Sequence, residues 1–519
     1  MTIKRLILGL MTLAIAFLVG GSLLKSLGEP QITNRLELYQ TDLLLHATEP
    51  QLLPGQPDEF TQLRKSVLGE NPLKSALEQY QKVRNTASKN LEKLETQLDA
   101  LGHAPVPSST PSANQTTGQG LTKAATTQAT QLQKVIEKQR SLIQQLDLRI
   151  GILQAKSGNS SDAKATWQNL TPPLDAIGEV LTGFWSDPPR ITPDAEPQIN
   201  RHLEGWFQYV ALAQLYELQQ RTDALTALQA QERAIAQNTL VKLALIGTVP
   251  VIGSLIGAGL LIFLFTQRLV KGRDSILATN ADLAWKTPWD WETILLVLVI
   301  GFFFTGQVLV PLIVSLLGLS FSTFATRGRA IYALTYYLMM AIFTLSILYF
   351  SIRKYIPLPE GWFQFKANLR WPLWGIGGYL AALPLMLGVS LINQQIWQGQ
   401  GGSNPLLQIV LEEADPIALA IFFFTAAVAA PVFEETLFRG FLLPSLTRYM
   451  PVWGAIALSS FIFAFAHLSL SEVLPLTVLG CVLGIVYTRS RNLLAPMLLH
   501  SLWNSITMLG LFLLGSAAR

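Results

Sequence analysis

Hydrophobic residues along this chain gather in long uninterrupted runs, and polar residues are concentrated in one block between the first run and the second. A membrane-spanning helix needs about 20 predominantly apolar residues, because that length covers the hydrocarbon core of a bilayer. The pattern predicts nine such helices, at 6–24, 241–266, 293–317, 330–352, 372–393, 417–447, 452–470, 473–488 and 494–515. We therefore expect an all-α, polytopic membrane protein.

The first apolar run is predicted to be an uncleaved membrane anchor. Lys4 and Arg5 precede it, as basic residues precede a signal peptide, but no small-residue cleavage site follows it. The hydropathy pattern then divides the whole chain into four parts: an anchor (1–25), a polar domain (26–238), a second span with an inner linker (239–291) and a membrane core (292–519).

The polar domain has the pattern of amphipathic helices. The stretches 72–100 and 121–157 are free of proline and carry Leu, Ile and Val at helical spacing. Between them, 102–120 is rich in Pro, Ser, Thr and Gly, a composition typical of a flexible linker. We expect a helical domain interrupted by this linker.

Two stretches of the polar domain resemble each other and look like tetratricopeptide half-repeats. Residues 153–167 and 214–228 both place Asp-Ala between a hydrophobic turn and a large apolar residue. Their separation does not match the repeat length that this architecture requires, so plain helical hairpins remain the alternative. In either case 26–238 would offer a docking platform for a protein partner.

Lysine and arginine in the short loops predict the orientation of the chain. With the N-terminus inside, thirteen of these residues fall in inner segments and three in outer short segments. Basic residues favour the inner side, whereas long loops cross largely regardless of charge. This asymmetry places 26–238 and the C-terminus on the outer side of the membrane.

Composition excludes several classes of protein. The 519 residues are 50% hydrophobic and only 14% charged, whereas a soluble protein carries about 25% charge. The net charge of +4 and the absence of a basic stripe with interleaved aromatics argue against a nucleic-acid partner. A single cysteine, Cys481, excludes an intramolecular disulfide. The lipid bilayer is the expected environment.

The predicted core spans contain a few ionisable side chains. They are Glu434, Glu435, Arg439, His467 and His500. A charged residue at the centre of a bilayer costs about 2.5–3.5 kcal/mol on insertion scales. Because this free-energy cost applies to each charged side chain, their presence indicates either a function or complete pairing of the charges inside the bundle.

Helical geometry separates the roles of the two glutamates. Glu435 and Arg439 are four residues apart, so they share a helix face and can form an ion pair. Glu434 is rotated about 100° around the helix and has no cation of its own. Glu434 is therefore the better candidate for a general base.

The two histidines each share a face with a residue four positions away. His500 and Asn504 project an imidazole and a carboxamide together, and Phe463 places an apolar wall beside His467. If these helices converge on Glu434, one cavity holds a carboxylate, two imidazoles and an amide. That set suits activation of a water molecule and stabilisation of an oxyanion.

These residues also have structural explanations. Glu435 with Arg439 would also serve as a clamp between helices, and an intramembrane histidine often makes only an interhelical hydrogen bond. The sequence contains neither the H-E-x-x-H motif of zinc metalloproteases nor the G-x-S-x-G motif of serine hydrolases. If these residues form an active site, it is therefore expected to be neither a zinc metalloprotease site of this type nor a serine hydrolase site.

The same residues bear on metal binding. A zinc site needs at least three well-placed ligands, but Glu435 is expected to pair with Arg439. Asn504, on the face of His500, suits an oxyanion better than a soft metal. We expect no metal or other cofactor. Under the metal-dependent alternative, the ligands would be Glu434, His467 and His500.

Three ordered motifs in the core resemble the CPBP intramembrane proteases, the group of CAAX-processing and bacteriocin-processing enzymes that includes the Ras-converting prenyl protease. The motifs are PVFEETLFRGFLLPSL (431–446), FAFAH (463–467) and HSLWN (500–504), which fit E-E-x-x-x-R, F-x-x-x-H and H-x-x-x-N. The resemblance covers 410–505, and residues 26–238 are no part of the family pattern.

The resemblance implies an all-helical membrane core that hydrolyses peptide bonds. By this analogy Glu434 and His467 activate water, and His500 with Asn504 forms the oxyanion hole. Glu435 and Arg439, with Phe463 beside them, would support these groups.

We expect an intramembrane endopeptidase that cleaves a membrane-associated protein or peptide, in a bacterial plasma membrane or a thylakoid-type membrane. The alternative is a non-proteolytic membrane scaffold or assembly factor that docks partners through 26–238. A transporter would predict inverted repeats and broken helices, and the sequence shows no such symmetry. Neither the substrate nor the oligomeric state follows from the sequence.

Overall fold

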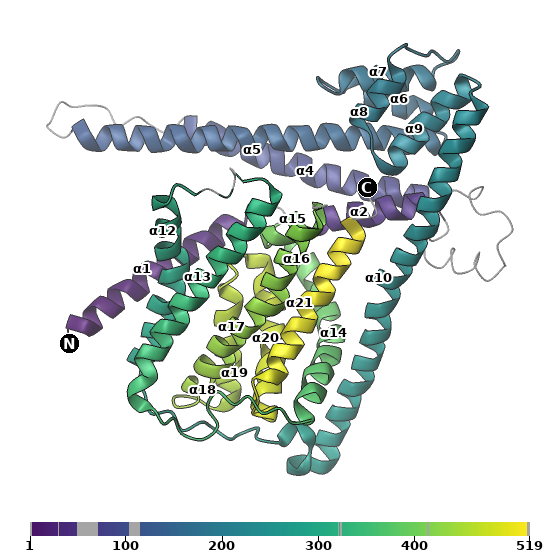
Figure 1. The fold of residues 1–519 in the computed structure, drawn as a ribbon. Helices are drawn as coiled ribbons and strands as arrows, with labels where there is room; N and C mark the ends of the chain where they lie inside the picture. The colour runs from purple at the N-terminus through teal and green to yellow at the C-terminus, as the bar shows by residue number, and fades with distance from the viewer. Residues whose placement is uncertain are drawn as a thin grey trace. The chain divides into compact units, whose positions relative to one another are not determined.

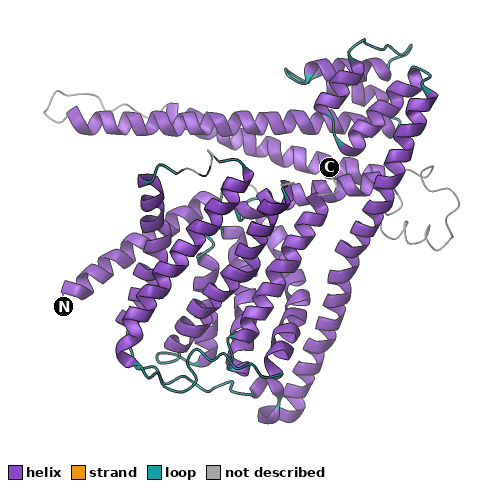
Figure 2. Cartoon of the chain, viewed as in Figure 1, coloured by secondary structure: helices purple, strands orange, loops and turns teal. Residues whose placement is uncertain are grey.

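The computed structural model describes residues 3–29, 31–48, 71–102, 115–319, 321, 324–412 and 415–515. Over these ranges the chain is helical and contains no strand (Figure 2). It forms two compact units, a membrane unit (Met1–Ile32 with Ala244–Ser516) and a helical unit (Thr33–Leu243).

The membrane unit is a bundle of long apolar helices. Eight helices in the described residues are long and apolar enough to cross a membrane. They are α1 (Ile3–Ser26), α10 (Thr222–Lys271), α11 to α12 (Trp291–Leu316), α13 (Thr326–Ile352), α14 (Arg370–Trp397), α16 to α18 (Pro416–Leu446), α20 (Leu470–Ser490) and α21 (Leu494–Gly515). The shorter helix α15 (Pro405–Glu412) packs against α21. This confirms the predicted all-α, multi-pass membrane protein.

The ninth predicted span, 452–470, is a shorter helix. Helix α19 (Val452–Phe465) has 14 residues, about 21 Å at 1.5 Å per residue. It follows Thr447, whose Oγ1 accepts a hydrogen bond from Trp285 N (3.1 Å). The prediction was therefore wrong about the length of this helix, although its position and apolar character were correct.

The residues after α19 reach the opposite end of the bundle. At the start of α20, Leu470 N donates to Ser26 Oγ at the end of α1 (3.0 Å), and Ser471 Oγ donates to Gly402 O (2.6 Å). Gly402 has φ +76°, a conformation that glycine adopts without steric cost. α19 and the short turn after it therefore run from one end of the bundle to the other, and α20 returns over the same distance.

The helix that carries the two glutamates is not a regular α-helix. Its central segment α17 (Ala430–Glu435) lies between two π-helical segments, η7 (Thr425–Ala429) and η8 (Thr436–Leu442). A third π-helical segment, η4 (Leu296–Leu309), follows α11 (Trp291–Leu295). π-Helical turns are rare in proteins as a whole, and those that occur often lie at functional sites. These turns set which carbonyls of the helix are free to accept hydrogen bonds from neighbouring helices.

The helical unit packs around a tryptophan-rich core. Its helices are α2 (Thr33–His46), α4 (Pro72–Gly102), α5 (Gln115–Lys156), α6 (Ser160–Gln168), α7 (Asp175–Phe184), α8 (Ala195–His202), α9 (Gly205–Leu218) and the start of α10. Trp167 and Trp206 are almost fully buried in this core. α4 and α5 lie side by side as a long hairpin (Figure 1). The predicted amphipathic helices are thus present.

Two sequence predictions for this unit can be placed on its helices. Gly102 ends α4 and Gln115 begins α5, so the last part of the predicted linker 102–120 is helical and the rest lies outside the described residues. The two similar stretches, 153–167 and 214–228, each form a helix, a short turn and the start of the next helix. The tetratricopeptide assignment stays a prediction.

Buried polar groups also hold the helical unit together. Tyr80 Oη donates to Asp42 Oδ1 (2.5 Å), and burial raises the pKa of this carboxyl. His46 Nδ1 lies 2.6 Å from Glu232 Oε1, and both side chains are almost fully buried. The first contact joins α2 to α4, and the second joins α2 to α10, the first and last helices of the unit.

Cysteine labelling tests the predicted orientation. In a Cys481→Ser background, we expect an exposed cysteine at Ser157 in the helical unit to react with a membrane-impermeant maleimide on intact cells. A matched cysteine at Thr279, exposed in the linker of 239–291, should react only after permeabilisation. The reverse pattern would overturn the assignment of 26–238 to the outer side.

Candidate active site

An ion pair inside the membrane unit connects the two turns that carry the E-E-x-x-x-R motif. Arg439 Nη1 donates to Glu435 Oε1 (2.8 Å), and both side chains are fully buried. Arg439 Nη2 also donates to Gly480 O on α20 (3.2 Å). The predicted pairing is therefore formed, and it ties α17 and η8 to a third helix segment.

His500 on α21 lies between the two glutamates. Its Nδ1 is 2.9 Å from Glu435 Oε1, and its Nε2 is 4.0 Å from Glu434 Oε2. A carboxylate accepts hydrogen bonds, so Nδ1 carries the proton in this contact. Nε2 is then an acceptor in neutral His500 and a donor only in the imidazolium form.

Glu434 has one oxygen engaged and one open. Tyr337 Oη on α13 donates to Oε1 at 2.9 Å. Oε2 is buried and has no hydrogen-bond partner among the residues that the structure describes. Glu435 receives hydrogen bonds from both Arg439 and His500 on its Oε1, and its Oε2 is likewise buried without a partner among the described residues. Glu435 is paired with Arg439, whereas the open oxygen of Glu434 lies 4.0 Å from His500 Nε2, so Glu434 is the better candidate for a general base.

Phe463 joins the second motif to the first. Its ring lies under the guanidinium of Arg439, with 4.5 Å between the guanidinium carbon and the ring centroid. The imidazole of His467 lies 5.0 Å from the same ring and that of His500 lies 5.9 Å away, centroid to centroid. Phe463 therefore contacts both imidazoles and provides the apolar wall beside His467 that the sequence predicted.

His467 follows α19 and is oriented by a carbonyl of that helix. Its Nδ1 lies 3.0 Å from Phe463 O, and a carbonyl can only accept, so Nδ1 is the donor. This leaves Nε2 as an acceptor in the neutral ring. His467 also interacts electrostatically with Glu472 on α20, whose Oε1 accepts from Asn404 N (2.8 Å). His467 joins the other motif residues through Phe463.

Asn504 binds the π-helical segment that precedes the glutamates. Its Nδ2 donates to Ala426 O (2.7 Å), and on the same helix Ser501 Oγ donates to Ala427 O (2.6 Å). Both acceptors belong to η7. The amide of Asn504 has two N–H bonds, and this contact uses one of them.

Sequence reasoning missed two polar neighbours of the motif residues. Tyr337 contacts Glu434, and Glu472 interacts with His467. Tyr337 lies in an apolar predicted span. Its hydroxyl could have indicated a polar neighbour, since a buried tyrosine hydroxyl usually finds a hydrogen-bond partner. Glu472 follows the F-x-x-x-H motif by five residues and lies between the predicted spans 452–470 and 473–488.

The donor set does not converge on a metal position. The described residues contain no group of three or more His, Cys, Asp or Glu side chains arranged to hold a metal ion. The Oε1 of Glu435 accepts hydrogen bonds from Arg439 and His500, and the Nδ1 of His467 donates to a carbonyl. Under the metal-dependent alternative the ligands would be Glu434, His467 and His500. Of these, Glu434 and His500 face each other, with 4.0 Å between Oε2 and Nε2.

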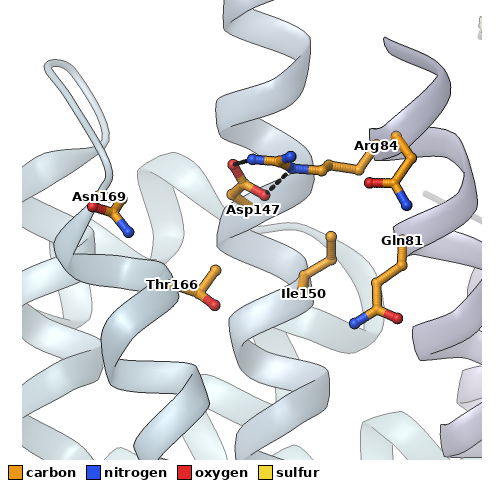
Figure 3. Close-up of a pocket in the computed structure, with 7 residues that line it drawn as sticks. Gln81, Arg84, Asp147, Ile150, Thr166 and Asn169 are labelled. Carbon is orange, nitrogen blue, oxygen red and sulfur yellow. Dashed lines mark hydrogen bonds and ion pairs between the residues drawn. The ribbon is translucent and has the colours of Figure 1, made fainter. Parts of the chain in front are cut away.

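A separate polar hollow of about 380 Å³ lies in the helical unit. Figure 3 shows its lining residues, among them Gln81, Thr166 and Asn169. Arg84 makes two hydrogen bonds to Asp147, from Nε (2.9 Å) and Nη2 (3.2 Å). Because this pair neutralises its own charge, the hollow presents amide and hydroxyl groups rather than a net charge. The docking role of 26–238 stays a prediction.

The fold and the site together define an integral, multi-pass membrane protein with paired carboxylates and imidazoles inside its helical bundle. Residues 416–506 match the family model described as type II CAAX prenyl endopeptidase Rce1-like. This range contains all seven residues that the sequence singled out, from Glu434 to Asn504.

Two curated relatives are similar to the same part of the chain. The putative membrane peptidase YdiL of Bacillus subtilis (strain 168) is 25% identical over 137 residues, 26% of this chain and 55% of that protein. The membrane-embedded CAAX protease MroQ of Staphylococcus aureus (strain USA300) is 26% identical over 143 residues, 26% of this chain and 56% of that protein. The chain spans about half the length of these relatives. No solved structure matches it significantly.

The family model and the two relatives all match the part of the chain that carries the three motifs, and they support its similarity to the CPBP intramembrane proteases. The resemblance found in the motifs is therefore confirmed.

Proposed function

We propose that this chain is an intramembrane endopeptidase that cleaves a membrane-associated protein or peptide. The observation that carries the proposal is the free Oε2 of Glu434, buried in the bundle and 4.0 Å from His500 Nε2. A water molecule placed between these atoms would contact both, and the carboxylate would accept its proton. The comparisons support the proposal through relatives described as membrane peptidases.

The proposed reaction divides the polar groups into acceptors and donors. Glu434 Oε2 and the Nε2 of His467 accept protons, which suits activation of the attacking water. The free N–H of Asn504 and, in its imidazolium form, Nε2 of His500 donate hydrogen bonds to the oxyanion. Glu435 accepts from His500 Nδ1 and thereby fixes the orientation of that ring.

The supporting residues act through charge and packing. Arg439 neutralises Glu435, so the buried site does not hold two adjacent uncompensated carboxylates. Phe463 packs against Arg439 and both imidazoles. A scaffold that only docks partners would have no use for an open carboxylate oxygen at this place.

A comparison of protein termini in membranes tests the proposed function. Cells that carry the wild-type chain should contain membrane-protein termini that are absent from cells lacking it and from cells with the Glu434→Gln variant. Those termini identify the substrate and the cleaved bond. Identical termini in all three strains, with the chain present at equal levels, would refute proteolysis and leave the scaffold alternative.

Chelation tests the proposal that no metal takes part. We expect the purified enzyme to keep its activity after prolonged treatment with a chelator, because the described donors do not present three ligands to one position. The measurement is cleavage of the identified substrate together with the metal content of the protein. Stoichiometric zinc, with activity lost on chelation and restored by zinc, would instead make His467 and His500 ligands beside Glu434.

A further inference from the structure

Tyr337 lies outside the segment that the family model matches, yet it contacts the proposed base. It belongs to α13, which packs beside α16 and η7 in the membrane unit (Figure 1). Its hydroxyl donates to Glu434 Oε1 at 2.9 Å, and its ring packs edge-on against Phe433 with 5.8 Å between the ring centroids. The tyrosine is thus held by packing and points its hydroxyl at one oxygen of the carboxylate.

This hydrogen bond determines which oxygen of Glu434 is open. Among the described residues, Tyr337 is the one that donates a hydrogen bond to this carboxylate. With Oε1 occupied, Oε2 remains on the side of His500. A carboxylate without this contact would be free to rotate about its last side-chain bond, because such terminal torsions are broad.

The neighbouring tyrosine shows that the contact is not needed merely to satisfy a hydroxyl. Tyr336 has the same side chain, and its Oη donates to the backbone carbonyl of Gly306 at 2.6 Å. A carbonyl of the π-helical segment η4 therefore suffices for a hydroxyl on this part of α13. Tyr337 instead bonds to an acidic side chain whose other oxygen is open.

We infer that Tyr337 is a positioning residue for Glu434, holding its carboxylate so that Oε2 faces the attacking water and His500. The inference rests on the proposed function, in which Glu434 is the general base. Tyr337 itself exchanges no proton with the substrate in this role. Its contribution is to the rate of the chemical step rather than to the binding of substrate.

Infrared spectroscopy of the purified full-length chain tests the contact without any substrate. The carboxyl band of Glu434 is the band that disappears in Glu434→Gln. We expect Tyr337→Phe to shift this band, because one hydrogen bond to the carboxylate is lost. The matched control Tyr336→Phe removes the neighbouring hydroxyl from Gly306 and should leave the band in place. An unshifted band in Tyr337→Phe would overturn the inference.

Kinetics on the substrate identified from the termini test the consequence. We expect Tyr337→Phe to lower kcat about tenfold, as for loss of one hydrogen bond to a charged group, with KM nearly unchanged. Tyr336→Phe should retain both constants. A shifted band with wild-type kcat would overturn the positioning role. Full activity of Glu434→Gln would instead remove Glu434 from the mechanism, and the band would still report the contact. Absence of any cleavage by the wild-type chain would refute the proposed function.

Discussion

Replacing Glu434 with glutamine is expected to abolish cleavage while the protein still folds and inserts into the membrane. Glutamine has the size of glutamate and its amide oxygen can still accept from Tyr337, but it cannot take a proton from water. Loss of a general base alone lowers turnover by ~10²–10⁴-fold. The measurement is cleavage of the identified substrate by purified protein, with expression and thermal unfolding compared with wild type.

Glu435→Gln is the matched control, since it is the same change one residue along the helix. Glu435 accepts from Arg439 and His500 inside the bundle, and all three side chains are buried. Removing one partner of a buried ion pair typically costs about 3–5 kcal/mol. We therefore expect Glu435→Gln to lower stability as well as activity. Retained turnover in a correctly folded Glu434→Gln protein would remove Glu434 from the mechanism.

Much of the membrane fold could be predicted because hydropathy reports burial in lipid directly. Apolar runs placed α13, α14, α20 and α21 within a few residues of their positions. The run at 452–470 was misjudged because apolar residues also continue past the end of a helix. His467 and Leu468 follow α19 in a turn, and Leu468 has φ +57°. Hydropathy depends on side-chain polarity alone, so it does not report such a change of backbone direction.

Contacts within one helix turn could be predicted, and contacts between helices could not. The four-residue spacing of Glu435 and Arg439 fixes their distance in any helix, and the ion pair is present. The contact of His500 with Glu435 depends on how α21 rotates against α17, which no local pattern specifies. Tyr337 was missed for the same reason, since its partner lies 97 residues away along the chain.

The π-helical segments were also beyond the sequence pattern. An apolar run predicts a helix but not whether its hydrogen bonds skip an extra residue. In η7 this change coincides with two carbonyls, Ala426 O and Ala427 O, that accept from Asn504 and Ser501. The position of the H-x-x-x-N motif against the glutamates is therefore set by backbone geometry that emerges only in the folded bundle.

Asn504→Ala is expected to lower turnover by ~10²–10³-fold, the usual effect of removing one oxyanion-hole donor. One N–H of this amide is bonded to Ala426 O, which fixes the direction of the other. The substitution also removes an interhelical hydrogen bond, worth about 0.6 kcal/mol on average in a membrane protein. So small a loss of stability does not account for a hundredfold loss of rate.

Ser501→Ala separates the two effects of that change. Ser501 lies on the same helix, and its hydroxyl makes the equivalent contact with the next carbonyl, Ala427 O, at 2.6 Å. We expect Ser501→Ala to lower thermal stability about as much as Asn504→Ala does, while turnover stays near wild type. The measurements are kcat and KM on the identified substrate, with thermal unfolding of both variants. Equal losses of turnover in the two variants would make Asn504 an interhelical contact and leave the oxyanion to His500.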